Sequence, residues 1–460
     1  MSEHYDLIVI GSGEGGKYLA WTLAGQGQKV VVVERRWIGG SCPNTNCLPS
    51  KNEIWSAETA HSVRHSAQMG IGVESMTVDM RRVVERKREM VRGLIDMHLD
   101  LFRSSGAELA MGHAQLTGPR RVRVELNDGG RRDLTAEKIV LNLGTSAEIP
   151  AVPGLAEAMP MTHVEILELD ALPRHLLIIG AGYVGLELGQ AYRRFGAEVT
   201  LLETGSQIAS REDADVSGEL RRLLEAEGII IHTGVNIRSV RGRSGDAVEV
   251  SVANEDAEWS IGASHILVAA GRRPNTRGIG LEEAGVALTP RGMIAVDERL
   301  ETTTPGIWAI GECAGSPAFT HASLDDFRII RDNLAGGNRS TRDRLMPYCL
   351  FTDPPLGRTG LTETEAKALG HDVRVAKLPM ARVLRSRTTG RRDGFMKAII
   401  GPDDRLLGFA MLGAEGGEVM AAVHVAMLAG LPYTAIRDAI IAHPTNAEGL
   451  NALFSAVPRA

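Results

Sequence analysis

Three scarcities exclude whole classes of protein for this chain. It has four cysteines in 460 residues, a net charge of only -6, and no apolar run of membrane-spanning length. Few cysteines argue against a secreted, disulfide-rich fold, and a bilayer helix needs ~20 predominantly apolar residues. The small net charge gives no reason to expect nucleic acid as a partner.

The N-terminus shows no pattern of a secretory leader. Met1-Ser2-Glu3 leads directly into a strand-like run, so we expect a cytoplasmic protein without a membrane anchor. In a reducing compartment, a disulfide is more often catalytic than structural. The length corresponds to about three domains.

Two of the four cysteines, Cys42 and Cys47, are separated by only four residues. Three interpretations of this spacing are open: two ordinary thiols, part of a metal site, or a redox-active pair. A zinc site is disfavoured because the remaining cysteines, Cys313 and Cys349, stand alone and no histidines lie at ligand spacing. The spacing alone leaves the other two interpretations open, and no metal is expected.

A straight helix cannot bridge these cysteines. Residues five apart lie ~7.5 Å apart along a helix axis, whereas the Cα atoms of a disulfide lie within ~6.8 Å. Pro43 and Pro49 also oppose a regular helix. We therefore expect an interrupted segment, in which a strained disulfide would be readily reduced.

Residues 5–34 have the order strand, glycine loop, helix, strand and acid. The loop follows the apolar run 5–10 and precedes a helix-like segment, 17–26. Its glycines suit a tight turn, close approach to a pyrophosphate and helix–strand packing, and the helix N-terminus favours phosphate. Glu34 stands where a carboxylate accepts hydrogen bonds from a ribose. The loop residues expected to bind a nucleotide are Gly11, Gly13 and Gly16.

A second unit of this kind begins at residue 176. The strand-like run 176–179 leads into another glycine loop, and a strand over 198–202 ends at Glu203. A carboxylate there favours NADH because it repels the 2′-phosphate of NADPH. Arg211, eight residues further on, is too distant in sequence to suggest a phosphate pocket. The loop residues are Gly180, Gly182 and Gly185.

Two dinucleotide units imply two nucleotides. Because the cysteine pair directly follows the first unit, the cofactor there should react with thiols, which fits FAD. Electrons would then pass from NADH through FAD to the disulfide.

With these features the chain resembles the pyridine nucleotide–disulfide oxidoreductases, the family of dihydrolipoamide dehydrogenase, glutathione reductase and mercuric reductase. The likeness spans essentially the whole chain. Further motifs that carry it are Asn142–Thr145, Gly271–Asn275, Thr304–Glu312 and His443–Glu448.

The resemblance implies a role for each active-site residue. Cys42 would attack the substrate, and Cys47 would be the thiolate in charge-transfer contact with the flavin. Lys51 and Glu187 match a pair near flavin N5. Tyr183 lies where many members have a side chain that swings aside as the nicotinamide binds.

His443 and Glu448 complete the expected site. An imidazole takes up and returns a proton near neutral pH, and a carboxylate on its other nitrogen selects the tautomer. The resemblance implies that His443 serves Cys42 of the partner subunit, which makes the protein a homodimer.

The resemblance also assigns further cofactor-binding positions. Glu312 departs from the family pattern, because an aspartate is expected to hold the flavin's ribitol. The further positions are Gly40, Ser41, Lys51, Gly144, Gly271, Gly311 and Glu312.

The expected fold is α/β, with two Rossmann-like domains and a C-terminal α+β dimerisation domain. Residues 1–149 and 271–339 should bind FAD, 150–270 should bind NAD, and 340–460 should form the interface. In the last domain we expect strands over 395–400 and 406–413 and helices over 417–429 and 434–440. The arginine-rich stretch 382–392 would attract an anionic substrate or, as the favoured interpretation, form an exposed loop.

The predicted function is reduction of a small disulfide or a thiol-reactive oxidant by NADH, with NADPH the less favoured donor. The segment Ala318–Arg328 resembles the mercuric-reductase branch of the family, whose members without tail cysteines include reductases of hypothiocyanous acid. The alternatives are dihydrolipoamide dehydrogenase, a metal-ion or quinone reductase and, in another class, a redox-sensing flavoprotein. Mercuric reduction is disfavoured because the tail after Asn451 has no cysteine pair.

Overall fold

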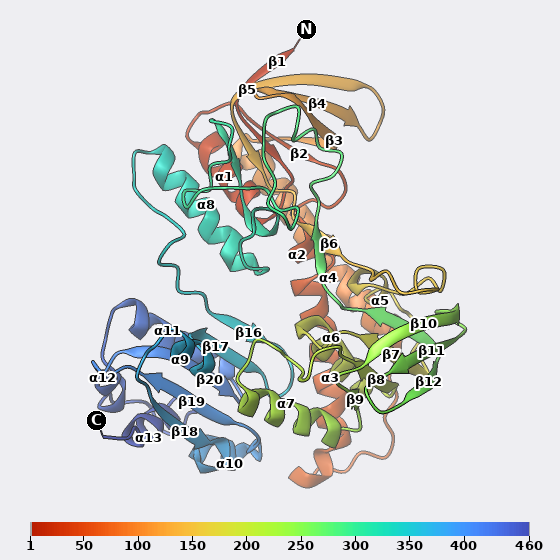
Figure 1. Cartoon of the computed structure of the whole chain (residues 1–460), viewed down its shortest axis with the longest axis vertical. Coiled ribbons are helices and arrows are strands. Elements are labelled where there is room, and N and C mark those ends of the chain that lie inside the picture. Colours follow the sequence, from red (N-terminus) through yellow and green to blue (C-terminus); the bar gives the residue numbers. More distant parts are fainter. Residues whose placement is uncertain (1, 460) are drawn as a thin grey trace.

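The computed structural model describes residues 2–459, and its N-terminal unit is built around a 6-stranded sheet (Figure 1). Strands β3, β2, β1, β5 and β15 pair in parallel, while β4 pairs antiparallel with β3 and β5. All residues of β2 are buried, as expected for a strand covered on both faces. The strands are β1 (Glu3–Ile10), β2 (Val30–Glu34), β3 (Glu108–Gly118), β4 (Arg121–Leu126), β5 (Arg131–Leu141) and β15 (Ile307–Ala309).

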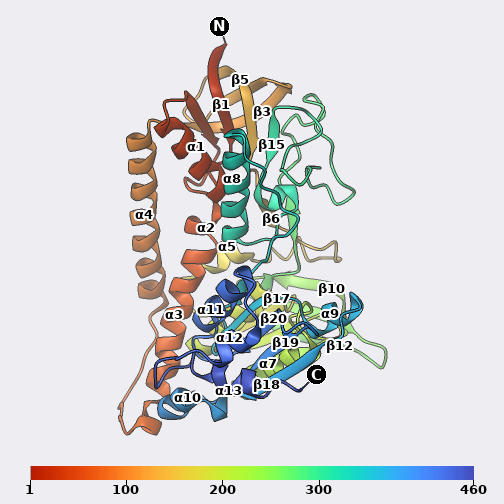
Figure 2. The same cartoon turned by 90° about the vertical axis from the view of Figure 1, so that its left-hand side faces the viewer.

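Two helices from opposite ends of this unit pack together. The Gly15 N–H of α1 (Glu14–Gly25) donates to the Ser323 hydroxyl of α8 (Thr320–Leu334) at 3.1 Å. The long helix α4 (Met80–Ser105) runs along one side of the molecule beside α3 (Cys47–Arg64) (Figure 2). Shorter helices are α2 (Ser41–Asn44), η1 (Ser66–Met69) and η2 (Gly311–Ala314).

The middle unit repeats the strand–loop–helix pattern. Its parallel sheet has the order β13-β7-β8-β9, and β10, β11 and β12 form an antiparallel sheet. The two-stranded ribbon of β6 and β14 joins this unit to the first (Figure 1). The elements are β6 (Thr145–Ala147), α5 (His163–Ile166), β7 (His175–Ile179), α6 (Tyr183–Phe195), β8 (Glu198–Leu202), α7 (Ala214–Ala226), β9 (Ile230–His232), β10 (Asn236–Arg243), β11 (Ala247–Ala253), β12 (Glu258–Ala263), β13 (His265–Val268) and β14 (Arg272–Pro274).

The C-terminal unit is an antiparallel sheet of order β16-β17-β20-β19-β18 with helices against it. Its core lies between the sheet and helices α11 and α13. The elements are β16 (Tyr348–Leu350), β17 (Leu356–Gly360), α9 (Glu363–Ala368), β18 (Arg374–Pro379), η3 (Met380–Arg382), α10 (Leu384–Thr389), β19 (Phe395–Ile400), β20 (Leu406–Leu412), α11 (Gly416–Leu428), α12 (Tyr433–Arg437) and α13 (Gly449–Ser455).

Two local predictions for this unit were wrong. The helix expected over 434–440 ends at Arg437, because the Asn451 side-chain amide donates to the carbonyls of Ile436 and Arg437. The expected arginine-rich loop contains helix α10, which is fastened by a buried bond of 3.1 Å from Ser386 to Asn446. The domain boundaries given above stay predictions. Within residues 2–459, no helix has both the length and the apolar character needed to cross a membrane.

Candidate redox-active site

The first glycine loop is closely packed against neighbouring backbone. Gly11 has a φ of 99°, and a Cβ there would lie 2.3 Å from the Asn142 carbonyl oxygen. A Cβ at Gly16 would lie 2.5 Å from Nδ2 of Asn142, and one at Gly40 would lie 2.5 Å from the Gly13 Cα. A side chain at Gly11, Gly16 or Gly40 would therefore displace backbone or the Asn142 amide.

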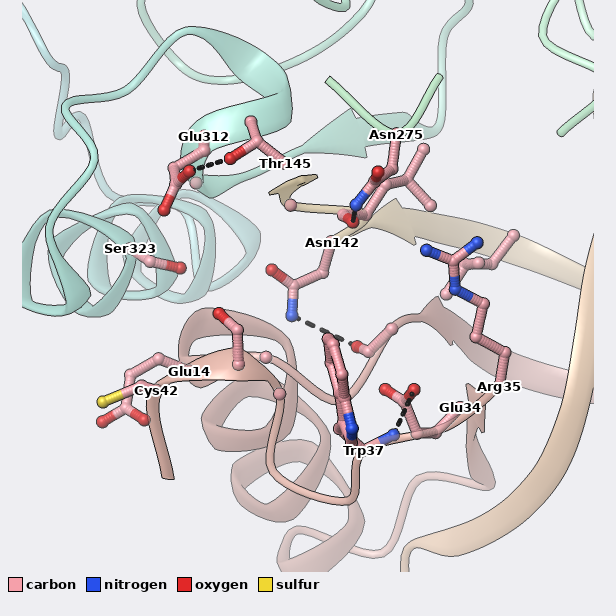
Figure 3. A pocket seen from close by; sticks show the side chains of 18 of the residues that line it. Glu14, Glu34, Arg35, Trp37, Cys42, Asn142, Thr145, Asn275, Glu312 and Ser323 are labelled. Carbon is pink, nitrogen blue, oxygen red and sulfur yellow. Dashed lines mark hydrogen bonds between the residues drawn. The ribbon is translucent and has the colours of Figure 1, made fainter. Parts of the chain in front are cut away.

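The Glu34 carboxylate holds this loop from the end of β2. One oxygen accepts from the Ser12 N–H at 2.9 Å and from its hydroxyl at 2.8 Å, and the other accepts from the Arg36 N–H at 2.8 Å. Glu34 also lines a pocket that includes Gly11, Gly13 and Trp37 (Figure 3). The acid predicted to contact a ribose therefore lies in the pocket wall and also braces the loop.

The cysteine segment is interrupted as expected. Helix α2 ends at Asn44, whose side-chain amide donates to the carbonyls of Ile38 and Gly40 at 2.9 and 2.7 Å. Helix α3 begins at Cys47. Both thiols are free and line the same pocket, with Ser41 at the start of α2 beside them.

The two thiols have opposite acidities. A hydrogen bond from the Cys42 thiol lowers the pKa of Cys47 to about 6, with help from the Thr320 hydroxyl 3.3 Å away and from the Lys51 cation. The same hydrogen bond and burial raise the pKa of Cys42. In the reduced pair, Cys47 is therefore the thiolate and Cys42 the thiol.

Lys51 connects this pair to the middle unit. Its Nζ lies 2.6 Å from Oε2 of the buried Glu187 on α6, whose other oxygen accepts from the Phe351 N–H at 2.9 Å. Lys51 follows Cys47 by one turn of α3, so a cation is fixed beside the thiolate.

Glu312, which stands where the family pattern has an aspartate, contacts residues of the β6–β14 ribbon. Its Oε2 lies 2.9 Å from Nε of Arg272 and accepts from the Thr145 hydroxyl (Figure 3). Gly144 and Gly311 line the same pocket, and a Cβ at Gly144 would meet no atom within 4 Å. The Glu312 carboxylate therefore contacts Arg272 and Thr145 within the wall of the pocket.

The second glycine loop has the same overall arrangement as the first but is more open at its second glycine. A Cβ at Gly185 would lie 2.1 Å from the Gly180 carbonyl oxygen, so α6 packs directly on the loop, whereas a Cβ at Gly182 would meet open space. The Glu203 carboxylate accepts from the Ala181 N–H at 2.9 Å and from the Gly205 N–H at 2.8 Å. This arrangement matches that of Glu34 in the first loop.

The remaining predicted residues lie at three further places. Gly271 has a φ of 143° and leads into β14, and Tyr183 begins α6 with its hydroxyl on Glu212. Nδ1 of His443 lies 2.8 Å from Oε2 of Glu448, and the His443 side chain is 66% exposed. Neither His443 nor Glu448 lines the pocket of its own chain.

The pocket at the first glycine loop, called here the first nucleotide pocket, has polar groups that fit FAD. It combines a tightly turned glycine loop, a helix N-terminus for phosphates and a carboxylate at the strand end. Gly11, Gly13 and Glu34 would hold the adenosine and pyrophosphate, with Gly144 and Glu312 further along. The cysteine pair lies in the same pocket, where a bound flavin would exchange electrons with it.

Three residues of this site received no individual role from the sequence. Thr320 contacts Cys47, although 273 residues separate them. Ser12 binds Glu34, and Asn142 packs against the first loop. Ser12 lies between two loop glycines, which is a local signal; Thr320 has none, because only the fold brings α8 to the cysteines.

Comparison with known proteins identifies the class. Residues 5–326 match the pyridine nucleotide-disulphide oxidoreductase family, and residues 346–453 match the dimerisation domain of that family. The chain therefore belongs to this family of FAD- and NAD(P)H-dependent enzymes, and the predicted α/β fold with a C-terminal dimerisation domain is confirmed. In the described residues, no cluster of three or more His, Cys, Asp or Glu side chains is arranged to hold a metal ion.

Individual relatives cover nearly the whole chain. RclA of Escherichia coli, described as a pyridine nucleotide-disulfide oxidoreductase, is 36% identical, with 98% of this chain and 99% of RclA covered. A dihydrolipoyl dehydrogenase of Thermus scotoductus and a mercuric reductase of Streptomyces lividans are each 34% identical over 97% of this chain, covering 96% and 94% of those proteins. The solved Cu(II) complex of the HOCl-induced flavoprotein disulfide reductase RclA has a TM-score of 0.89 at 34% identity, covering 99% of both chains.

Proposed function

We propose that this enzyme uses NADH to reduce a small disulfide or another thiol-reactive oxidant through the Cys42–Cys47 pair. The observation that carries the proposal is the pair of hydrogen-bonded thiols in the wall of the first nucleotide pocket, with the Cys47 pKa lowered to about 6. A thiolate is the reactive form of cysteine. FAD, when bound, would relay the electron pair from NADH to the disulfide.

The reaction balances without a further reactant. NADH supplies two electrons and one proton, solvent supplies a second proton, the S–S bond of the substrate breaks and two thiols form. On the enzyme, Cys42 would attack the substrate and Cys47 would then displace the bound product, which restores the Cys42–Cys47 disulfide. His443, oriented by Glu448 at 2.8 Å, would carry the proton to the leaving thiolate.

This role for His443 requires a homodimer with a shared site, and three observations support such a dimer. The imidazole is exposed and lies outside the pocket of its own chain, while the C-terminal unit matches a dimerisation domain. In the proposed dimer, His443 faces Cys42 of the partner subunit.

NADH is proposed as the donor on account of Glu203. Its carboxylate ends β8 next to the second glycine loop, where it would repel a 2′-phosphate. The expected result is a kcat/KM for NADH at least about tenfold above that for NADPH, measured with the same acceptor. Equal values would exclude this assignment.

Anaerobic reduction tests the electron path. NADH should produce a long-wavelength charge-transfer band in the purified holoenzyme, and Cys47→Ser should abolish that band. Cys313→Ala is the matched control, because Cys313 is fully buried within η2 and burial raises its pKa to about 11. A wild-type enzyme without the band, or a Cys47→Ser variant that keeps it, would refute the proposal.

The acceptor is then identified as the compound that removes the charge-transfer band of the reduced enzyme. Low-molecular-weight disulfides, hypothiocyanous acid, hypochlorous acid, lipoamide, quinones and Cu(II) are mixed with the reduced enzyme. Cu(II) is included because a solved relative is described as a Cu(II) complex. Turnover of lipoamide alone would identify a dihydrolipoamide dehydrogenase, and turnover of none would favour a redox sensor.

A further inference from the structure

A carboxylate lies at the cysteine end of the first nucleotide pocket. Glu14 is the first residue of α1, and it lines this pocket together with Cys42. Figure 3 shows both side chains at the same end of the pocket, and the negative charge of Glu14 is one cause of the raised pKa of Cys42. Phosphate binding does not explain this acid, because a negative charge at a helix N-terminus opposes a bound phosphate.

A buried lysine holds the Glu14 carboxylate from behind. Nζ of Lys17 lies 2.7 Å from Oε2 of Glu14, and the Lys17 side chain is 4% exposed against 18% for Glu14. The same ammonium donates to Nε2 of His98 at 2.8 Å, because the other ring nitrogen of His98 donates to the Leu94 carbonyl. The wall of the pocket therefore presents the carboxylate, while its cationic partner stays within the protein.

No cation of the pocket wall balances Glu14 at the cysteine end. Among the described residues that line the pocket, Arg35 is the one lysine or arginine. It directly follows β2, and Figure 3 places it at the opposite end of the pocket from Cys42. A negatively charged molecule that approaches Cys42 would therefore meet a negative field from Glu14, to which the Cys47 thiolate of the reduced enzyme adds.

We propose that Glu14 is a specificity-determining residue: it disfavours anionic oxidants at Cys42 and favours small neutral or cationic disulfides. The inference rests on the proposed reduction of a small disulfide or another thiol-reactive oxidant through Cys42. The chemical steps are those of the proposed function, and Glu14 acts on the approach of the substrate. Its carboxylate repels a substrate anion and attracts a substrate cation over the same distance, so the two charge classes should respond in opposite directions.

The test uses three disulfides of similar size that differ in charge. Cystamine is cationic, hydroxyethyl disulfide is neutral and dithiodipropionate is anionic, and kcat/KM is measured for each with NADH. Glu14→Gln keeps the shape of the side chain and removes its charge. The ratio of kcat/KM for the anionic to the neutral disulfide should rise about fivefold, and the cationic-to-neutral ratio should fall about fivefold. A fivefold change corresponds to about 1 kcal/mol, as expected for two charges ~4 Å apart in water.

The matched control is Glu219→Gln on α7. The Glu219 carboxylate is 23% exposed and pairs with Arg222, three residues later, at 2.8 Å, as Glu14 pairs with Lys17. Glu219 is not part of the lining of the first nucleotide pocket, so its replacement should leave both ratios unchanged. If Glu14→Gln does not fold with FAD, Glu14→Ser removes the same charge and takes its place.

Alkylation of Cys42 gives a second measurement that needs no turnover. In a Cys47→Ser background reduced with dithiothreitol, Cys42 displaces iodide from anionic iodoacetate or from neutral iodoacetamide and forms a thioether. The rates are followed by the mass of the Cys42 peptide. Adding Glu14→Gln should raise the iodoacetate-to-iodoacetamide ratio of rates about fivefold. A role of Glu14 in folding alone would leave this ratio unchanged.

Two results would overturn the inference. One is a Glu14→Gln variant in which the disulfide ratios and the alkylation ratio equal those of its parent. The other is a Glu219→Gln variant that shifts the disulfide ratios as far as Glu14→Gln does, since the net charge of the protein would then be the cause. If NADH reduces none of the three disulfides and no other oxidant, the proposed function is refuted, and the alkylation ratio still decides the role of Glu14.

Discussion

Replacing Lys51 by methionine should raise the Cys47 pKa by about one unit. Cys47 and Lys51 stand one turn apart on α3, a spacing of about 5–6 Å between their Cβ atoms. Two charges at ~6 Å interact with about 0.7 kcal/mol in water and about 2.8 kcal/mol at an effective dielectric constant of 20, or roughly 0.5 to 2 pKa units. The middle of this range is about one unit.

The assay is the pH dependence of the charge-transfer absorbance in the reduced enzyme. A lowered thiol pKa means that the thiolate is present above that pKa and is lost as pH falls through it. In wild type the band should therefore disappear as pH falls through about 6. In Lys51→Met its midpoint should lie near pH 7, so the band at pH 6.5 should be markedly weaker.

The control is Lys367→Met, which removes an exposed lysine paired with Glu363 on α9 of the C-terminal unit. It should leave the midpoint unchanged. A wild-type midpoint near 8.5, the ordinary value for a thiol, would refute the assigned thiolate. An unchanged midpoint in Lys51→Met would refute the electrostatic role of the lysine.

Three further predictions concern the dimer, the cofactor and stability. The Cys42→Ser and His443→Gln variants should each be inactive. An equimolar mixture whose subunits have re-equilibrated should recover about a quarter of wild-type turnover, because half the dimers then have one intact site. No recovery would place both residues in one subunit's site. Glu34→Gln should weaken FAD binding about tenfold, measured by flavin release on ultrafiltration, and an unchanged affinity would contradict the ribose contact. Lys397→Met should lower the free energy of unfolding in urea by about 3–5 kcal/mol, because the 3% exposed ammonium of Lys397 contacts Asp213, Asp215 and Glu363. Lys377→Met, at a lysine whose side chain is 43% exposed, should lower it by less than about 1 kcal/mol.

The cofactor loops were readable from sequence because their chemistry is local. A turn such as Gly11–Gly16, the helix behind it and the acid at the next strand end lie within about 25 consecutive residues, and each has its own residue preference. The interruption at the cysteines followed likewise from proline and from the reach of a disulfide. The end of α12 did not, because its cap comes from Asn451, outside the segment.

Consecutive residues therefore sufficed for the fold class, both glycine loops and the interrupted cysteine segment, since short-range geometry specifies them. Other properties needed the folded chain. The acidity of Cys47 depends partly on Thr320, 273 residues away, and the Tyr183 and Tyr348 hydroxyls reach Glu212 from two different units. Such contacts leave no periodic or local signal, because electrostatic coupling between side chains depends on their separation in space rather than along the chain.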